Sequence, residues 1–279
     1  MSSPAILPAS EAEASEAEML LSFETGAPAE VRSALGIAAA RIGGGVALAM
    51  RHDPMDHWSV ALGLGFAEPV TADLVDEIGA FYSAQHVGRA RFQLAPEALP
   101  GDWPEICEKT GLAAGGTSVK LVCRTEIALA RITEHRPATD LRVAPVSPQD
   151  ATAWGSAQVR GFGEPEGDLV ALSASVVGRE GWHAFGTWDG DGLVGTGALH
   201  VRAGVAQFFG GATLPRARKR GGQTALLAAR AELAASLGCT WLVAETGAED
   251  PGTHNPSLHN MLRLGFEVRY ERRDWIWQA

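Results

Sequence analysis

The stretch LPRARKRGGQTALL, residues 214–227, places four cationic side chains directly before two glycines and an alanine- and leucine-rich segment. The residues FFGGATLP, 208–215, which lead into it, have the aromatic and β-branched character of a strand, and residues 224–237 place leucines along one stripe of a helix. Where a strand leads through a glycine loop into a helix, unpaired N–H groups and the positive end of the helix dipole converge. The stretch therefore predicts an anion site, and phosphate suits it. Its cations are Arg216, Arg218, Lys219 and Arg220.

Gly221 and Gly222 remove side chains from the start of the predicted helix, so that a phosphate can reach the backbone amides. Thr224 adds a hydroxyl donor. Two common phosphate fingerprints are absent, because the sequence has neither GxxxxGK[ST] nor a GxGxxG that opens the helix. The alternative is a simple turn with solvated cations, but four cations together in a chain of net charge −10 favour a ligand.

The composition is that of an ordinary globular protein, and it limits the functions open to the chain. Of 279 residues, 46% are hydrophobic, and no apolar run approaches the ~20 residues of a membrane span. The negative net charge argues against a nucleic-acid surface, which needs a basic face. Acidic residues stand where a signal peptide carries cations, so we expect a flexible acidic tail over residues 1–19 and a cytoplasmic protein. Cys107, Cys123 and Cys239 lack CxxC spacing, which predicts neither a disulfide framework nor a metal site.

The second half of the chain alternates predicted strands and helices. Segments rich in β-branched and aromatic residues begin at positions 182, 193, 205, 239 and 266 and predict five strands. A short helix is bracketed by Asn255 as N-cap, Pro256 at its first position and Gly265 at its end. Two more helices are predicted over residues 147–163 and 164–178, ahead of these strands.

The first half repeats strand, helix, strand, helix, strand with a weaker pattern over residues 57–124. Gly111–Leu112, which ends its second helix, precedes Gly265–Phe266 by 154 residues, and this spacing predicts a duplicated domain. Glu68 and Asp73 stand where the second half has arginines, so we expect the first half to bind no phosphate. The predicted organisation is a degenerate domain over residues 20–126, a linker over residues 127–140 and a complete domain over residues 141–279.

The loop RKRGGQ, residues 218–223, resembles the R/Q-x-x-G-x-G/A loop of the GNAT-type N-acetyltransferase superfamily, with Gln223 in place of the last Gly or Ala. The segment NPSLHNMLRLGF, residues 255–266, resembles the short helix after the fifth strand in that family. Over the first half the resemblance is one of element order alone. It implies an α/β fold of two GNAT-like domains, each a mixed and mostly antiparallel sheet flanked by helices. It also implies a splay between the fourth and fifth strands of the second domain.

The resemblance implies acetyl-CoA as the acyl donor. In the family arrangement the end of the fourth strand, here Ala212 and Thr213, pairs with the pantetheine arm. Asn255 and Asn260 would line the arm, although an N-cap for Asn255 and a polar helix face for Asn260 are the alternatives. The pyrophosphate would lie near Arg218 and Lys219, on the amides of Arg220, Gly221, Gly222, Gln223 and Thr224.

The tyrosine that many family members use as a general acid is absent, because alignment on the helix end places Met261 at its position. Phe208 and Phe209 occupy the part of the fourth strand where a carboxylate is common. Glu245, at the end of the strand WLVAETG, is the remaining candidate for a general base, since alternation along the strand turns it toward the splay. A carboxylate that only orders the following loop is the alternative.

These residues predict transfer of an acetyl group from acetyl-CoA to a primary amine of a small molecule or peptide by direct attack, with backbone N–H groups of the fourth strand on the oxyanion. The alternative is a CoA-binding sensor or scaffold without catalysis.

A hydrolase triad of Ser257, His259 and Glu245 lacks the GxSxG elbow. His254 and His259, five residues apart across a helix start, are a poor metal pair by spacing. The expected partners are acetyl-CoA and an amine, with a homodimer left open.

Overall fold

The structure is a computed structural model that describes residues 6–250 and 252–279. The strands of the first half are β1 (Ile37–Ile42), β2 (Gly45–Met50), β3 (Val60–Leu62), β4 (Arg89–Gln93) and β5 (Ala113–Arg124). Those of the second half are β6 (Arg142–Pro145), β7 (Trp182–Asp189), β8 (Gly192–Arg202), β9 (Val205–Thr213), β10 (Trp241–Gly247) and β11 (Glu267–Gln278).

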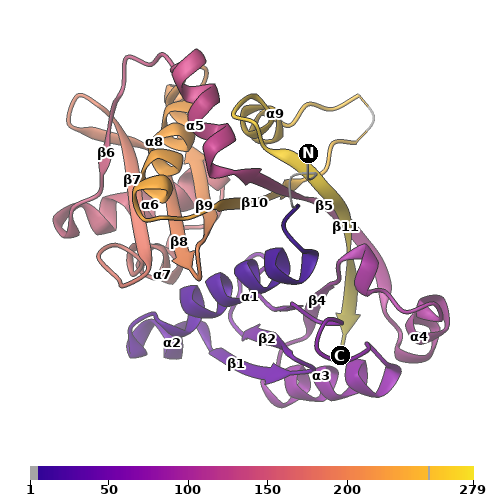
Figure 1. Ribbon diagram of the computed structural model, residues 1–279. Helices are drawn as coiled ribbons and strands as arrows, with labels where there is room; N and C mark the ends of the chain where they lie inside the picture. Colours follow the sequence, from indigo (N-terminus) through magenta and orange to yellow (C-terminus); the bar gives the residue numbers. More distant parts are fainter. Residues whose placement is uncertain (1–5, 251) are drawn as a thin grey trace, which may run out of the picture.

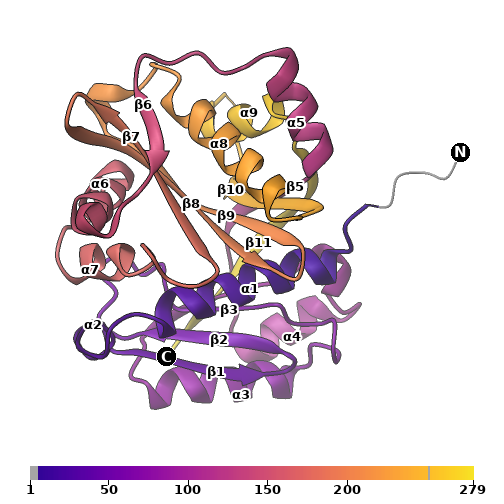
Figure 2. The same cartoon turned by 60° about the vertical axis from the view of Figure 1, so that its left-hand side comes forward.

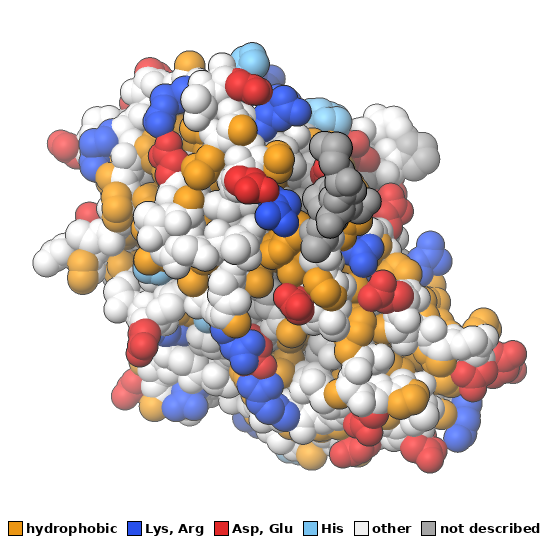
Figure 3. All heavy atoms as spheres, in the orientation of Figure 1, with side chains coloured by type: hydrophobic (Ala, Val, Ile, Leu, Met, Phe, Trp, Pro, Cys, Tyr) orange, Lys and Arg blue, Asp and Glu red, His pale blue; other side chains and the backbone are white. Residues whose placement is uncertain are grey.

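The helices of the first half are α1 (Ala9–Thr25), α2 (Ala29–Leu35), α3 (Ala72–Ala84), α4 (Trp103–Thr110) and α5 (Thr125–Glu134). Those of the second half are α6 (Ala151–Phe162), α7 (Asp168–Ala174), α8 (Gly222–Ser236) and α9 (Pro256–Arg263). Within the described residues, no helix combines the length and the apolar composition needed to cross a membrane. The face drawn in Figure 3 mixes acidic and basic side chains.

The described strands form one continuous sheet in the order β1-β2-β3-β4-β11-β5-β10-β9-β8-β7-β6 (Figures 1 and 2). Each half places its last strand in the sheet of the other, because β5 pairs with β10 and β11 pairs with β4. The two exchanged strands also pair with each other, antiparallel. In that ladder Ser118 lies opposite Arg272, 154 positions later, which is the offset of the internal repeat. An approximate two-fold axis therefore relates the halves at this pair.

Helices cover both faces of the sheet, and strand alternation decides which residues meet which helix. On β2, Val46 and Leu48 belong to the cluster under α1, whereas Ala47 and Ala49 belong to the cluster under α3 and α4. In the second half, α5, α8 and α9 pack over one face. The other face packs against α6 and α7, together with α1 and α2 from the first half. The N-terminal helices therefore join the cores of both halves.

The flexible tail predicted over residues 1–19 is wrong for the described part, where α1 begins at Ala9. Its acidic residues include three buried ones, Glu13, Glu16 and Glu24. An acidic segment without nearby cations is typical of a solvated tail. Here the cations that neutralise Glu13 and Glu16 are Lys120 and Arg272, which are far away in the sequence. Residues 1–5 of the predicted tail lie outside the described residues.

The linker predicted over residues 127–140 is also wrong in its first part, which is helix α5. Ala128 and Ile132 of α5 are buried in the core beneath α8, so this segment belongs to the second half by packing. The remaining residues, 135–141, lead from α5 to β6. Because β5 and β11 are exchanged, a boundary near residue 140 does not separate two independent sheets.

Candidate active site

The splay expected between the fourth and fifth strands of the second half lies between β9 and β10. These two strands pair in parallel at only three positions, the last of which joins Val243 to Gln207. Beyond that point the β9 ladder to β8 contains a bulge between Thr196 and Ala198, and Gly210 opposite it has a φ of 63°. A bulge bends a strand and leaves a residue unpaired, so the end of β9 turns away from β10.

The loop after β9 brings backbone amides together at the start of α8, as its sequence predicts. Lys219 and Gly221 both have left-handed backbones, with φ of 62° and 77°, and α8 begins at Gly222. The N–H groups of residues 221–224 have no hydrogen-bond partner within the described part of the chain. Four free donors at a helix N-terminus are suited to an anionic ligand.

The four cations of the loop differ in their contacts. Arg220 is held by two carboxylates, Asp189 at 2.7 Å and Asp140, and these bonds raise its pKa. Arg218 donates to the backbone oxygens of Thr213, at 3.2 Å, and Gly161, at 3.3 Å. Lys219 and Arg216 are exposed and make no ion pair within residues 6–250 and 252–279. Arg220 therefore braces the loop, and Lys219 and Arg216 remain available to a ligand.

The packing of the loop explains why position 221 is a glycine, and the sequence alone does not reveal this. A Cβ atom at this position would lie 2.1 Å from the carbonyl oxygen of Ala138, in the segment that leads to β6. At Gly222 a Cβ would lie 3.0 Å from Leu141 Cδ1. Gly221 is therefore needed for this packing whether or not a phosphate binds, whereas a side chain at position 222 would meet only the end of a leucine side chain. A larger residue at position 221 would disturb the loop itself, so it cannot report on ligand contact.

Gln223, the departure from the family pattern, turns inward to the end of β9. Its Nε2 donates to the carbonyl oxygens of Ala212 and Thr196 and, at 3.0 Å, to Thr213 Oγ1. The carbonyl group of Thr213 accepts from Arg218. The carbonyl groups of Ala212 and Thr213, whose backbone was predicted to pair with the pantetheine arm, therefore already accept hydrogen bonds from the protein. Gln223 acts as a brace between β9 and α8.

Glu245 lies where β9 and β10 part, which agrees with its predicted orientation. Gln207 Nε2 donates to Glu245 Oε2 at 2.7 Å across the apex of the splay. The other oxygen, Oε1, lies 2.7 Å from Lys120 Nζ on β5. The Glu245 side chain is 15% exposed, so it keeps some access to solvent. Its partners are strand residues, and this contradicts the alternative in which it orders the following loop.

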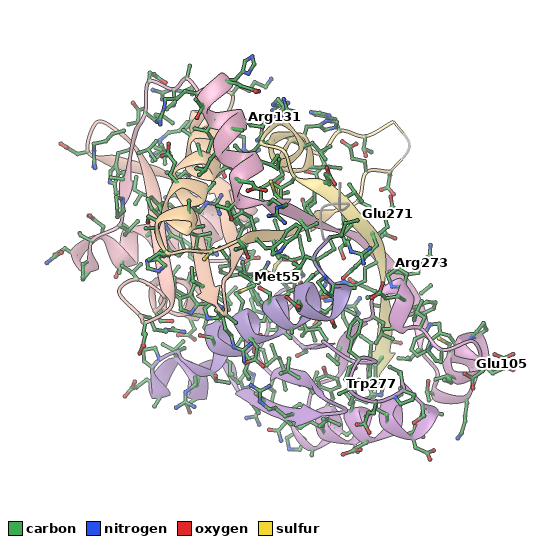
Figure 4. All side chains as sticks on the ribbon, viewed as in Figure 1. Met55, Glu105, Arg131, Glu271, Arg273 and Trp277 are labelled. Atoms are coloured by element: carbon green, nitrogen blue, oxygen red, sulfur yellow. The ribbon has the colours of Figure 1, made fainter. Side chains whose placement is uncertain are left out.

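A buried charge cluster continues from Glu245 into the first half. Lys120 Nζ lies 2.6 Å from Glu16 Oε2, and Arg272 contacts both Glu13 and Glu16 at 2.6 and 2.8 Å. The sequence does not predict this cluster, because its members lie far apart in the chain. Arg272 is buried between the exposed Glu271 and Arg273, which are labelled on β11 in Figure 4. In the described residues the cluster holds three carboxylates and two cations: Glu13, Glu16, Glu245, Lys120 and Arg272.

Because the cluster has three carboxylates and two cations, the pKa values of Glu245 and Glu16 differ widely. Burial raises the pKa of Glu245 to about 7, with the Glu16 carboxylate adding to the rise and Lys120 opposing it. Burial also acts on Glu16, but the attraction of Arg272 and Lys120 outweighs it and lowers the pKa of Glu16 to about 2. Near neutral pH Glu245 is therefore the carboxylate of this pair that can gain or lose a proton.

Arg230 on α8 is a second buried cation that the sequence analysis missed. It is 2% exposed, lies over the Phe208 ring and donates to the backbone oxygens of Ala198, at 3.2 Å, and Phe209, at 3.3 Å. Burial lowers its pKa to about 9, and no carboxylate of the described chain forms an ion pair with it. Its guanidinium thus ties α8 to β8 and to the bulged part of β9. In the sequence, Arg230 stands four residues after Leu226 on the apolar stripe of the helix, and this position indicates a buried arginine.

The two asparagines assigned to the arm have partners of their own. Asn255 caps α9 by accepting from the amides of Ser257 and Leu258, and its Nδ2 donates to Gly247 and Thr246. The N-cap alternative is therefore confirmed for Asn255. Asn260 accepts from Thr224 Oγ1 at 3.4 Å and from Arg263, so it links α9 to the first turn of α8. Met261, at the position of the absent tyrosine, is buried in the core.

The structure also bears on the hydrolase triad and on the first half's counterpart of the glycine loop. The hydrolase triad does not form, because His259 pairs with Glu249 and Glu245 pairs with Lys120. In the first half, the segment between β3 and α3 lines a hollow of about 330 Å³ with Glu68 among its walls. The hydroxyl group of Thr71 caps α3 there by accepting from the amide of Leu74. That helix start lacks the glycines and cations of its counterpart.

Comparisons with known proteins gave matches among solved structures alone: no family model matches the chain, and no curated protein matches it. A GCN5-related N-acetyltransferase from Kribbella flavida superposes with a TM-score of 0.62 at 18% identity, covering 96% of both chains. A tandem GNAT protein from the clavulanic acid biosynthesis pathway gives a TM-score of 0.60 at 14% identity, covering 96% of this chain and 93% of that one. A putative GNAT acetyltransferase from Novosphingobium aromaticivorans gives 0.52 at 15%, covering 97% and 99%. The chain therefore has a tandem GNAT-type fold.

Proposed function

We propose that the protein is an acetyl-CoA-dependent N-acetyltransferase that acetylates a primary amine of a small molecule or peptide by direct attack. The observation that carries the proposal is the row of unpartnered amides at the start of α8, beside a splay whose apex holds a carboxylate with a pKa of about 7. The GNAT-type fold of the solved neighbours supports it.

In this proposal the amides of residues 221–224 hold the pyrophosphate of the coenzyme, and Lys219 and Arg216 add positive charge from the loop. Because the carbonyl groups of Ala212 and Thr213 are occupied, the arm would meet the part of β9 nearer the apex. Backbone N–H groups there would stabilise the oxyanion of the tetrahedral intermediate. Binding both reactants in one orientation would supply much of the rate.

Glu245 is the proposed general base. An alkylamine has a pKa of about 10.4 in water and arrives protonated, so one proton must leave before the nitrogen can attack. A carboxylate whose pKa is near 7 is a useful acceptor at neutral pH, directly or through one water. Lys120 would hold Glu245 Oε1 in place, leaving Oε2 beside Gln207 at the apex.

A CoA-binding sensor or scaffold is the second candidate. It is favoured by Met261, whose buried side chain cannot protonate the departing thiolate. It is also favoured by the contact of Glu245 with Lys120, which opposes proton uptake.

One experiment separates the two candidates. The full chain is incubated with acetyl-CoA and a panel of amines, amino acids and peptides, and free thiol is measured, with acetyl-CoA binding followed by calorimetry. The enzyme predicts thiol release that depends on both an amine and Glu245. Binding without release for any amine would support the sensor, and absence of binding at millimolar acetyl-CoA would contradict both.

A further inference from the structure

The loop between β10 and α9 brings together three side chains that can ligate a metal ion, Glu249, His254 and His259. One ligand atom from each lies within 4.8 Å of the other two. Glu249 Oε1 is 3.0 Å from His259 Nε2 and 3.6 Å from His254 Nδ1. The spacing of the two histidines in the sequence argued against a metal pair, but the loop folds back and adds Glu249 between them.

The separations of Glu249 from the two histidines are close to those of a tetrahedral metal centre. With Zn–N and Zn–O bonds of about 2.0–2.1 Å, two ligand atoms of a tetrahedron lie about 3.3 Å apart, and the two measured separations fall on either side of this value. Two imidazoles and one carboxylate suit zinc better than magnesium or calcium, which prefer oxygen ligands alone. Three protein ligands leave one position open to water.

The loop already holds the carboxylate in place. The backbone amide of Asn255 donates to Glu249 Oε1, and Asn255 itself is fixed as the N-cap of α9. Thr253 closes a turn within the loop by donating to the Asp250 carbonyl group. A hydrogen bond to a ligating carboxylate orients it for the metal. The Glu249 carboxylate is therefore already oriented within the described residues of the loop.

We propose that Glu249, His254 and His259 bind one Zn²⁺ ion, with water as the fourth ligand. Because His259 belongs to α9 while the other two ligands belong to the loop, the ion would fasten the loop to the helix. The site begins two residues after β10, the strand that carries Glu245. The proposal does not depend on the acetyltransferase function, since it concerns metal binding alone.

The test is zinc titration of the metal-free full-length chain by calorimetry, with bound zinc counted by elemental analysis. We expect one equivalent of Zn²⁺ and a higher melting temperature in its presence, since a ligand that binds the folded state stabilises it. Each of His254→Ala, His259→Ala and Glu249→Gln should weaken binding by about tenfold or more, roughly 1.4 kcal/mol. His135→Ala, at an exposed histidine on α5's C-terminal end, is the matched control and should leave binding unchanged.

Two further readouts distinguish a built site from chance binding. Metal binding displaces protons from its ligands, so affinity should fall as the pH is lowered. Bound Co²⁺ should give the visible spectrum of a tetrahedral centre. Absence of Zn²⁺ binding by the parent chain, or three ligand variants that all keep the affinity of the parent chain, would overturn the proposal.

Discussion

At the residue scale, the charge of Glu245 depends on side chains from both halves. Gln207 and Lys120 fix its two oxygens, and Glu16 on α1 adds the negative charge that helps to raise its pKa to about 7. A surface carboxylate would be ionised throughout the neutral range. Here ionisation and protonation are balanced near neutral pH, which gives two measurable consequences.

The first consequence concerns the reaction. Replacing Glu245 by Gln keeps the shape of the side chain but removes the proposed base, so we expect kcat to fall by about 10²–10⁴ while acetyl-CoA affinity is retained. Steady-state kinetics and calorimetry measure the two quantities. Glu271→Gln, an exposed carboxylate on β11, is the control and should change neither. If kcat stays within a few-fold and only thermal stability falls, Glu245 has a structural role.

The second consequence concerns pH. Glu245 accepts a proton only when ionised, so kcat/KM should fall as the pH drops through about 7. Glu16 raises the pKa of Glu245, and Glu16→Gln should therefore move this limb of the profile to lower pH. A weakly basic acceptor amine keeps its own titration out of the measured range. If the variant remains folded by circular dichroism and the limb does not shift, Glu16 does not influence the group that accepts the proton.

At the scale of elements, the loop between β9 and α8 depends on its neighbours for its shape. Arg220 is tied to Asp140 and Asp189, Gln223 to the end of β9, and Gly221 to Ala138. These contacts set the direction of the free amides at the start of α8. They leave Lys219 as a cation whose removal would not disturb the fold.

Lys219 thus offers a direct test of phosphate binding. Lys219→Glu reverses a charge beside the proposed pyrophosphate and should weaken acetyl-CoA binding by about tenfold, most clearly at low ionic strength, because salt screens exposed charges. Calorimetry in low and high salt measures this effect. Lys109→Glu makes the same change on the first half, where Lys109 is also exposed, and should have no effect on binding. Equal affinities for the Lys219 variant and the parent chain would remove the loop from the coenzyme site.

At the scale of the whole molecule, the exchange of β5 and β11 makes each half depend on the other. Without residues 1–140, β10 loses its antiparallel partner β5, and β11 loses both β4 and β5. Strand edges that have lost their partners promote association with other chains. The charge cluster would also lose Lys120 and the carboxylates of α1.

A fragment of residues 141–279 should therefore be aggregated or self-associated. Co-expression with residues 1–140 should restore a stable complex of the two pieces. Light scattering after size-exclusion chromatography and circular dichroism measure these outcomes. A monomeric 141–279 fragment that unfolds cooperatively would show that the exchanged strands are dispensable.

Local signals were sufficient for much of the second half. The Asn255-Pro256 start of α9, the glycine loop before α8 and the strands from Trp182 to Glu267 follow from capping, turn and strand preferences that act over a few residues. The first half was harder, because β1, β2, α1 and α2 carry weak or misleading composition. The acidic repeat of α1 looked like a solvated tail until Lys120 and Arg272 supplied its partners.

The sequence by itself therefore determined the order of elements in the second half and the glycine loop ahead of α8, since each depends on neighbours along the chain. Only the tertiary structure decided the strand exchange, the partners of Glu245 and the use of Arg220 as a brace. These features arise between residues far apart in the chain, such as Lys120 and Glu245 or Arg220 and Asp140. Strand pairing and charge compensation of this kind depend on which residues come close together in the folded chain, and no local sequence pattern predicts that proximity.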